Sequence, residues 1–194
     1  MPLNKIITKN YKSLKDFPLD LKPFMVFIGP NNAGKSNILD CFKFLAEYTG
    51  VEQDARNAIQ TRSGFGEIVF NGELGETISF ELHGSIRVKD KERDYKYFIE
   101  LEGDRWGNCF NKRETFSLIE NGEKGLLEFP TEKNTGIARD ESGKQTGETG
   151  AGKAQSYLCY FSDQDNYPIL VLCDINSVTF FGSHTALSQG LSPL

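Results

Sequence analysis

Residues Gly29 to Asn37 have the types and the spacing of a phosphate-binding loop. The run consists of Gly29, Pro30, Asn31, Asn32, Ala33, Gly34, Lys35, Ser36 and Asn37. Gly29, Gly34, Lys35 and Ser36 fit the pattern G-x-x-x-x-G-K-[ST] at every fixed position. Successive backbone N–H groups in such a loop form a nest for anions, and the N-terminus of the following helix adds partial positive charge. The chemistry that this stretch predicts is therefore the binding of a triphosphate tail.

The side chains of the loop have separate expected roles. The two glycines permit close backbone approach and unusual φ angles, while Asn31 and Asn32 tolerate the left-handed region better than most residues do. Lys35 is expected to reach the β- and γ-phosphates, and the Ser36 hydroxyl is expected to ligate Mg²⁺. The alternative interpretation is a strand-to-helix turn that only caps its helix.

Two elements must flank the loop for the motif to be meaningful. The apolar run Phe24–Ile28 before it predicts a strand. After it, the positions Ile38, Leu39, Phe42, Leu45 and Ala46 recur at intervals of three and four residues. That spacing predicts a helix with one buried stripe, which Gly50 can end.

The rest of the first 130 residues favours strands. Lys5–Asn10 is a short strand candidate, and apolar residues alternate in Phe17–Leu21, so two strands are expected before the loop. A short helix is possible through Ala55 and Ile59. Alternation then predicts further strands, around Ile78–Leu82, Tyr95–Leu101 and Phe116–Leu118. The middle of the chain is therefore expected to be an antiparallel meander rather than a series of βαβ units.

Residues 134–153 are polar and glycine-rich, and they predict a mobile surface loop. Within them, Gly147–Lys153 also satisfies G-x-x-x-x-G-K. However, Ala154 stands where the metal-binding hydroxyl belongs, and no apolar strand leads into this second match. We therefore interpret it as plain loop.

The C-terminal part has two interpretations. Asp163–Asn166 can cap a helix that begins near Tyr167. Alternatively, Ile169–Asp174 is a buried strand that ends in a carboxylate, which is the shape of a Walker B magnesium ligand. Ile175 occupies the position where the usual glutamate would follow.

Composition limits the function further. A chain of 194 residues is long enough for one domain, and its net charge of −5 provides no general attraction to DNA, RNA or an anionic membrane. The four cysteines show no metal-ligand or disulfide spacing. Neither a signal peptide nor a long apolar segment is found, so a soluble, cytoplasmic protein without membrane contact is expected.

Asn10–Leu14, Phe17–Leu21 and Phe27–Asn37 together resemble the N-terminal opening of the ABC-type ATPases of the RecF, SMC and OLD group. The resemblance implies an α/β P-loop NTPase fold. The expected fold is an ABC-ATPase-like first lobe with a mixed sheet, the P-loop helix, an antiparallel β subsheet and a helical C-terminal part. It also implies ATP and Mg²⁺ as cofactors, a role in DNA repair or phage defence, and a position near the nucleotide for Lys12 and Ser13. The simpler interpretation of Lys12 and Ser13 is a solvated turn.

The chain also departs from that family. Members have a second lobe with a signature helix, a Walker B strand ending in Asp-Glu and a switch histidine. Leu187–Gly190 resembles the signature only superficially, because four residues follow it and one is a proline. His83 and His184 are best interpreted as surface or core histidines. Residues 1–194 are therefore expected to form one domain, an incomplete head that binds ATP. Whether it hydrolyses ATP stays open, and its partner would be a second copy or a missing second lobe.

Two other functions remain possible. A small P-loop kinase would fit the chain length, although such kinases place the loop after their first strand and continue with βαβ units. A non-catalytic, nucleotide-dependent interaction module is the other alternative, and the intact Lys35 and Ser36 weigh against a vestigial loop.

Overall fold

The computed structural model describes residues 3–50, 55–88, 91–119, 122–132, 134–140, 142–149 and 156–157. The strands are β1 (Leu3–Tyr11), β2 (Leu14–Asp20), β3 (Ile78–Val88), β4 (Lys91–Gly103), β5 (Cys109–Ile119), β6 (Glu123–Phe129), β7 (Gly136–Arg139) and β8 (Gln145–Thr149). The helices are α1 (Lys35–Thr49), α2 (Ala55–Gln60), α3 (Phe65–Ile68) and the 3₁₀ turn η1 (Phe70–Gly72).

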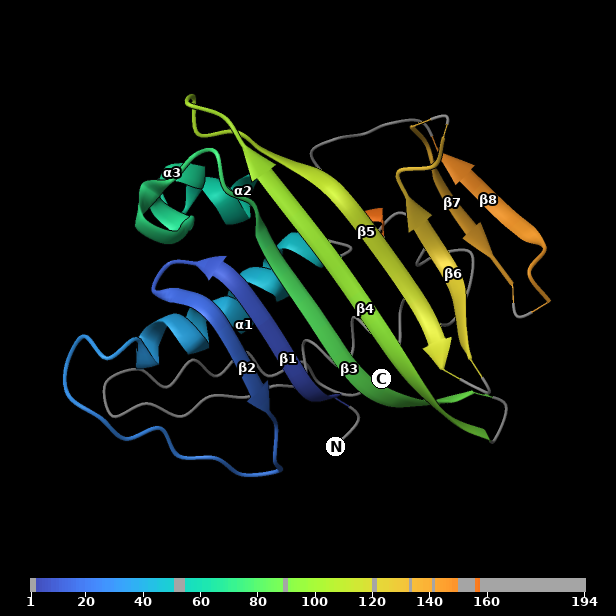
Figure 1. Ribbon diagram of the computed structural model, residues 1–194, viewed down its shortest axis with the longest axis horizontal. Coiled ribbons are helices and arrows are strands. Elements are labelled where there is room, and N and C mark those ends of the chain that lie inside the picture. Colours follow the sequence, from blue (N-terminus) through green and yellow to red (C-terminus); the bar gives the residue numbers. More distant parts are fainter. Residues whose placement is uncertain are drawn as a thin grey trace.

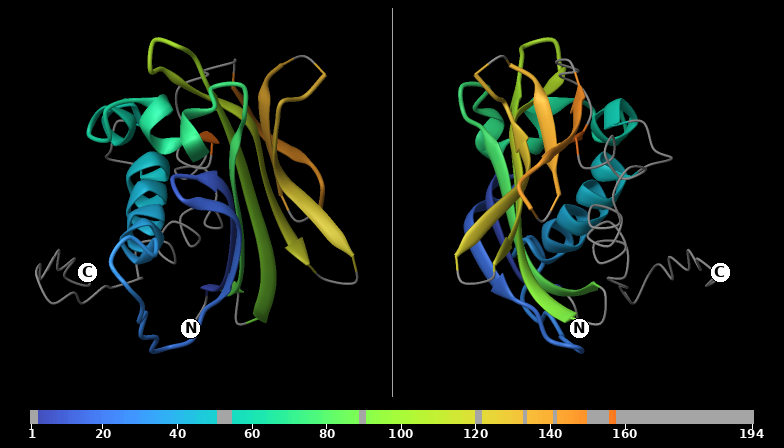
Figure 2. Two further views of the ribbon diagram at one scale, coloured as in Figure 1. Left: turned by 60° about the vertical axis from the view of Figure 1, so that its left-hand side comes forward. Right: turned by 90° about the vertical axis from the view of Figure 1, so that its right-hand side faces the viewer.

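The strands form one eight-stranded sheet in the order β2-β1-β3-β4-β5-β6-β7-β8, with the helices gathered on one of its faces (Figures 1 and 2). Each neighbouring pair in this order is antiparallel. The antiparallel meander is therefore confirmed. The expectation of a mixed sheet is wrong for the described residues, because every strand pair is antiparallel, including β1–β3, which the crossover through the helices brings together.

The elements around the loop form largely as the sequence predicts. The two expected N-terminal strands are present as β1 and β2, and α1 ends at Gly50, which has extended backbone angles. The short helix expected through Ala55 and Ile59 is α2. Of the predicted stripe of α1, Ile38, Phe42 and Leu45 are buried, whereas Leu39 and Ala46 are only partly buried. The buried face also includes Cys41, Phe44 and Tyr48.

An aromatic cluster holds α1 on the sheet. The ring of Phe44 lies 5.4 Å from that of Tyr11 on β1, 5.7 Å from that of Phe80 on β3 and 5.6 Å from that of Tyr48. All four side chains are almost completely buried. Rings at such separations contribute about 0.5–1.5 kcal/mol per pair beyond their buried area. The second half of α1 is thereby packed against β1 and β3.

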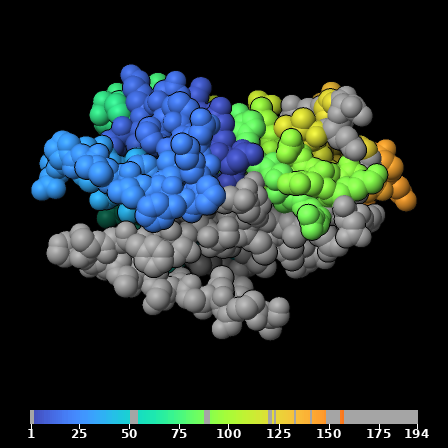
Figure 3. Space-filling model, turned by 90° about the horizontal axis from the view of Figure 1, so that it is seen from below, coloured from blue at the N-terminus to red at the C-terminus, as the bar shows by residue number. Residues whose placement is uncertain are grey.

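The strand predicted to lead into the loop does not form. Residues 21–30 contain no strand, and they curve away from the sheet between β2 and α1 (Figure 1). Phe24, Val26 and Ile28 are 81%, 65% and 91% exposed. Seen from below, the blue and light blue N-terminal segments form the surface at one end of the molecule (Figure 3). A strand needs a neighbour for its backbone hydrogen bonds, and no described strand pairs with residues 21–30.

The described part of the predicted loop, residues 134–140 and 142–149, contains secondary structure. It forms the β7–β8 hairpin, and β7 buries Ile137 and Ala138. Gly147, the first residue of the second G-x-x-x-x-G-K match, pairs with Ala138 as part of β8. Hairpin pairing therefore gives order to a segment with few apolar residues.

A buried carboxylate connects the sheet to residues 156–157. Glu114 on β5 is fully buried and accepts hydrogen bonds from the Tyr97 hydroxyl at 2.9 Å, the Ser156 hydroxyl at 2.7 Å and the Tyr157 backbone N–H at 2.8 Å. A further bond comes from the Asn111 amide. The helical or Walker B interpretations of residues 163–175 and the signature-like Leu187–Gly190 lie outside the described residues. In the described part, no helix is long and apolar enough to cross a membrane.

Candidate phosphate-binding site

The backbone of the loop adopts the geometry that its residue types permit. Gly34 immediately precedes α1 with φ of +83°, and Asn32 has φ of +67°. Within the loop, the Ala33 N–H donates to the Pro30 carbonyl at 3.3 Å. The left-handed residues turn the chain sharply into the helix. The first N–H groups of α1, which have no partner inside the helix, therefore lie beside the loop.

Lys35 points back into its own loop. Its Nζ donates to the carbonyls of Gly29 at 2.8 Å and Pro30 at 2.6 Å. The ammonium group thus lies at the start of the loop, close to the N-terminus of α1. Both are sources of positive charge, so this arrangement suits an anion. Ser36 is exposed in the first turn of α1, and Asn31 is exposed in the loop.

The β1–β2 turn lies against the loop. The Asn37 amide donates to the Ser13 hydroxyl at 2.8 Å. A Cβ atom at Gly34 would lie 2.8 Å from the same hydroxyl oxygen, which leaves no room for a side chain there. The Lys12 N–H donates to the Ile68 carbonyl at 2.7 Å and anchors the turn to α3. Ser13 therefore lies at the loop, as the family resemblance implies, and its side chain is also exposed to solvent, as expected of a solvated turn.

Asp40, one turn further along α1, joins three elements. Its carboxylate accepts a hydrogen bond from Tyr11 at 2.6 Å, pairs with Lys12 at 2.6 Å and is held by the Arg62 guanidinium at 3.0–3.2 Å. Arg62 also pairs with Glu47, and its side chain is only 7% exposed. Burial tends to raise the pKa of Asp40, but the hydrogen bonds from Arg62, Lys12 and Tyr11 outweigh burial and lower it to about 2. The carboxylate is therefore ionised at neutral pH and fixes the turn beside the loop.

Sequence reasoning missed this cluster. Asp40 is an ordinary polar position on a helix, and Arg62 lies 22 residues away in a connecting segment. A charged residue on a predicted helix gives no sign of its partner, so only the folded chain reveals the contact.

The remaining candidates do not meet the loop in the described part of the chain. His83 lies on β3 and pairs with Glu81 at 2.7 Å. Asp174, Lys153 and His184 are outside the described residues. Where the structure is described, no group of three or more His, Cys, Asp or Glu side chains could hold a metal ion.

The loop fits a phosphate tail on three observations of this structure. Gly34 has left-handed angles that a side chain would strain, a Cβ atom would fill the space between it and Ser13, and the Lys35 ammonium is turned into the loop. The Ser36 hydroxyl is exposed in the adjacent helical turn, so this oxygen is accessible to a ligand at the loop.

Comparisons with known proteins identify the family of the chain. Residues 1–156 match the family model of the AAA ATPase domain. Over 117 residues, the chain is 44% identical to the chromosome partition protein Smc of Methanocaldococcus jannaschii. This match covers 53% of this chain and 10% of that protein. The chain thus spans about a tenth of the length of this relative.

One solved chain comes from work described as "Structural biochemistry of ATP-driven dimerization and DNA stimulated activation of SMC ATPases". It is 19% identical, with a TM-score of 0.39, and the match covers 64% of this chain and 72% of that one. Such a score is too low to support an inference about the fold. The family model and the Smc relative confirm the resemblance of the N-terminal residues to the ATPase lobe of the SMC and RecF type. The chain belongs to the AAA ATPase domain family.

Proposed function

We propose that this chain binds ATP with Mg²⁺ through residues 29–37 and serves as the nucleotide-binding half of an ATPase related to the SMC type. The observation that carries the proposal is the left-handed Gly34 beside the inward-turned Lys35 ammonium at the start of α1. This arrangement offers positive charge and backbone donors in one place, with no side chain in the way.

Each residue of the loop has a defined task in this proposal. Lys35 exchanges its two carbonyl partners for β- and γ-phosphate oxygens. The backbone from Pro30 to Ser36 surrounds the phosphates, and the Ser36 hydroxyl holds Mg²⁺ together with them. The metal ion supplies charge neutralisation between the phosphates. Ser13, which already contacts Asn37, limits the space beside the loop.

The proposed site is only half of what hydrolysis needs. Phosphoryl transfer requires a second protein ligand for the metal ion and a group that orients the attacking water. The described residues provide neither of these beside the loop. The exposed apolar residues Phe24, Val26 and Ile28 suit a strand that gains its neighbours from a second lobe or from a second copy. A role in DNA repair or phage defence is part of the proposal through the family resemblance alone. The net charge of −5 adds no support for DNA binding.

A small P-loop kinase is less well supported. Its βαβ units would give parallel strand pairs next to the loop, whereas the strand pairs described here are antiparallel. A non-catalytic interaction module stays compatible with nucleotide binding, and turnover measurements distinguish it from an ATPase.

A thermal shift tests the nucleotide site. ATP with Mg²⁺ at about 100 times its Kd should add about 2.7 kcal/mol of stability, which raises the Tm by roughly 5–10 °C. Lys35→Ala should abolish this shift and leave the Tm without nucleotide nearly unchanged, because the side chain bonds only to its own loop. Lys153→Ala, at the second Gly-Lys pair, is the matched control and should keep the full shift. An equal shift in Lys35→Ala would refute the site.

The Ser36→Ala variant distinguishes the contribution of the metal ion to binding from that of the phosphates. The variant should retain the part of the thermal shift that persists with ATP and EDTA, and it should lose most of the increment that Mg²⁺ adds. If the Mg²⁺ increment were intact in Ser36→Ala, another group would be holding the metal ion.

A further inference from the structure

Helix α3 lies between two turns that belong to different parts of the sheet (Figure 1). At its C-terminal end, the Lys12 N–H of the β1–β2 turn donates to the Ile68 carbonyl at 2.7 Å. At its N-terminal end, the Phe65 N–H donates to the carbonyl of Gly107, in the β4–β5 turn, at 3.2 Å. One turn of helix therefore joins the β1–β2 turn, which contacts the phosphate-binding loop, to the β4–β5 turn.

The packing of α3 prevents it from moving independently of these turns. The side chains of Phe65 and Ile68 are fully buried. A Cβ atom at Gly103 on β4 would overlap the Phe65 ring, so the ring fills the space over that strand. Just after the helix, Val69 forms a β-bridge with Tyr11 at the end of β1. Because closely packed interiors transmit displacements, we expect α3 to move as one unit with both turns.

Ser13 connects the phosphate-binding loop to the β1–β2 turn. The Asn37 amide donates to its hydroxyl at 2.8 Å, and a Cβ atom at Gly34 would lie 2.8 Å from the same oxygen. The gap between the loop and the turn therefore cannot absorb a displacement as large as one carbon atom. Nucleotide binding changes this region, because Lys35 must leave the carbonyls of its own loop to reach a phosphate.

Lys12 makes the β1–β2 turn able to respond. Its φ is +50°, in the left-handed region that lysine rarely adopts. The contacts of the turn, rather than the backbone preference of Lys12, therefore hold the turn in this shape. A change in the contacts of Ser13 is passed on to the Lys12 N–H and from there to the Ile68 carbonyl.

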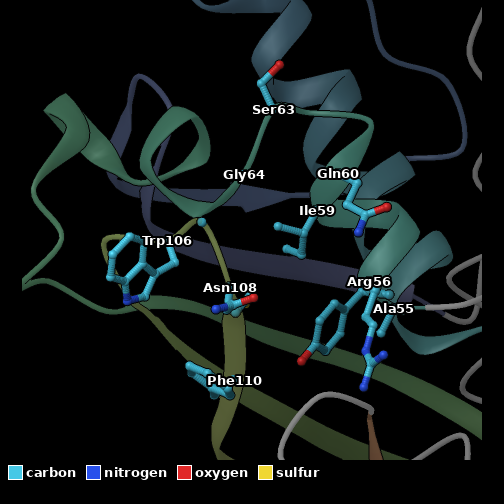
Figure 4. Close-up of a pocket in the computed structure, with 12 residues that line it drawn as sticks. Ala55, Arg56, Ile59, Gln60, Ser63, Gly64, Trp106, Asn108 and Phe110 are labelled. Carbon is cyan, nitrogen blue, oxygen red and sulfur yellow. The ribbon is translucent and has the colours of Figure 1, made fainter.

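The β4–β5 turn at the other end of α3 has a defined structure. The Asp104 carboxylate accepts hydrogen bonds from the N–H groups of Trp106 at 2.8 Å and Asn108 at 3.0 Å. Gly64, directly before α3, has a φ of +100°, and a Cβ atom there would lie 3.2 Å from the Gly107 Cα. Gly64, Trp106 and Asn108 line one cavity of about 510 Å³ (Figure 4). A displacement of α3 therefore changes the surroundings of Trp106.

Trp106 is too far from the loop for direct contact with a bound phosphate tail. Tyr48 lines the same cavity, and α1 separates it from Lys35 by about 20 Å along the helix axis. We propose that α3 couples nucleotide binding at residues 29–37 to the β4–β5 turn, an inference that rests on the proposed function. Such coupling is reciprocal, so the shape of the turn also affects the affinity for ATP. Since the indole is 75% exposed, the nucleotide state becomes detectable at the protein surface.

Trp106 is the only tryptophan of the chain, so its fluorescence reports on the β4–β5 turn directly. ATP with Mg²⁺ should change its emission saturably, with the same midpoint as the Kd that calorimetry measures. Lys35→Ala should abolish both signals. The double variant Trp106→Phe/Ile119→Trp moves the reporter to the opposite end of β5, where residue 119 is 42% exposed. Its emission should not respond to ATP, because α3 does not end there.

Ser13→Ala tests the contact at the loop end of the path. At saturating ATP, the change in Trp106 emission should fall to about half of the wild-type change or less, because the Asn37 contact is gone. The amplitude at saturation does not depend on affinity, so weaker binding alone cannot cause this loss. The matched control, Ser85→Ala, removes a hydroxyl that is bonded to Glu92 on the neighbouring strand β4 and should keep the full amplitude.

Gly107→Ala tests the reverse direction, from the turn to the loop. The substitution strains a residue with φ of +82° and should change the Kd for ATP by at least about threefold, within the range for mutations between coupled sites. The matched control is Gly143→Ala in the β7–β8 turn. It has a φ of +86°, and a Cβ atom there meets no described group within 4 Å. This control should keep the wild-type Kd.

Calorimetric binding of ATP without a change in Trp106 emission would overturn the coupling and leave the nucleotide site intact. Full amplitude in Ser13→Ala, a response of the reporter at residue 119, or a wild-type Kd in Gly107→Ala would each overturn it as well. The emission tests do not require Gly107→Ala to fold. If the wild-type chain bound no ATP in calorimetry, the nucleotide site would fail and the coupling with it, so the two failures are distinguishable.

Discussion

Gly34 shows how much of the proposed nucleotide site depends on the absence of one side chain. Its φ of +83° lies in the region that costs other residues about 1–2 kcal/mol. A Cβ atom would also lie only 2.8 Å from the Ser13 hydroxyl oxygen. Strain and contact therefore act on the same residue, and they can be separated by mutation.

We expect Gly34→Ala to lower the free energy of unfolding by about 1–3 kcal/mol and to abolish the thermal shift caused by ATP. Urea denaturation measures the first effect. In the Ser13→Ala background the contact with the hydroxyl is gone and only the φ strain remains, so the cost of Gly34→Ala should be smaller there. If the cost were the same in both backgrounds, the contact with Ser13 would contribute nothing.

Asp40 holds three elements together through its charge. Its pKa of about 2 in the folded protein is lower than the usual 3.8, so the group binds protons more weakly in the folded than in the unfolded chain. The ionised Asp40 side chain contributes about 2 kcal/mol to the stability of the folded protein. This contribution is complete at pH values above the pKa of Asp40 in the unfolded chain, and it is lost as the pH falls toward 2.

Asp40→Asn should therefore destabilise the protein at pH 7 by about 2–3 kcal/mol, because it leaves the largely buried Arg62 with fewer anionic partners. Urea unfolding between about pH 7 and pH 2.5 measures how the free energy of unfolding of each protein depends on pH. The difference in this free energy between wild type and variant should narrow as the pH drops below about 4. A gap that is constant with pH would mean that the charge of Asp40 is not responsible.

At the scale of elements, the same apolar pattern has different outcomes in different places. β1 and β3 each have a strand on both sides, and their alternating apolar residues lie in the core together with those of the helices. Phe24–Ile28 is just as apolar but has no strand beside it in the described part of the chain, and alternate side chains point into solvent. Hydrophobicity alone therefore does not make a strand.

Val26→Lys should leave the Tm of the isolated chain within about 1–2 °C of wild type, because Val26 is 65% exposed. Val69→Lys is the matched control. At 2% exposure, it should cost several kcal/mol or prevent folding. Differential scanning calorimetry compares the two variants. A strong loss of stability in Val26→Lys would show that Phe24–Ile28 packs into the isolated protein.

For the whole molecule, the main question is whether the chain carries all the groups that ATP hydrolysis needs. The chain spans about a tenth of the length of its Smc relative. Beside the loop, the described residues contain nothing that could orient the attacking water. Asp174 is the one candidate for a second metal ligand, and it lies outside the described part.

The isolated chain should therefore bind ATP but hydrolyse it barely above the uncatalysed rate. Steady-state phosphate release from the purified protein measures this, with Lys35→Ala as the control for contaminating ATPases. A Lys35-dependent rate near 1 s⁻¹, which is ordinary for enzymes, would mean that the chain carries a complete site. Loss of Mg²⁺-dependent binding in Asp174→Asn would favour the Walker B interpretation. A loss of stability alone would favour the helix.

The sequence by itself determined the features that depend on near neighbours. The loop motif, the stripe of α1, its end at Gly50 and the alternation in β1 to β5 all repeat within a few residues, and local backbone geometry dictates them. The covalent chemistry of Gly34 and Asn32 also permits the left-handed angles that they adopt.

Only the tertiary structure decided which segments have partners. It left Phe24–Ile28 unpaired, turned the polar residues 136–149 into a hairpin, and joined Asp40 to Arg62 across 22 residues. It also formed a cavity between α2 and the β4–β5 turn from residues with no common motif. The physical reason is that strand pairing, ion pairing and enclosure depend on groups far apart in the chain, and no local pattern records which of them will meet.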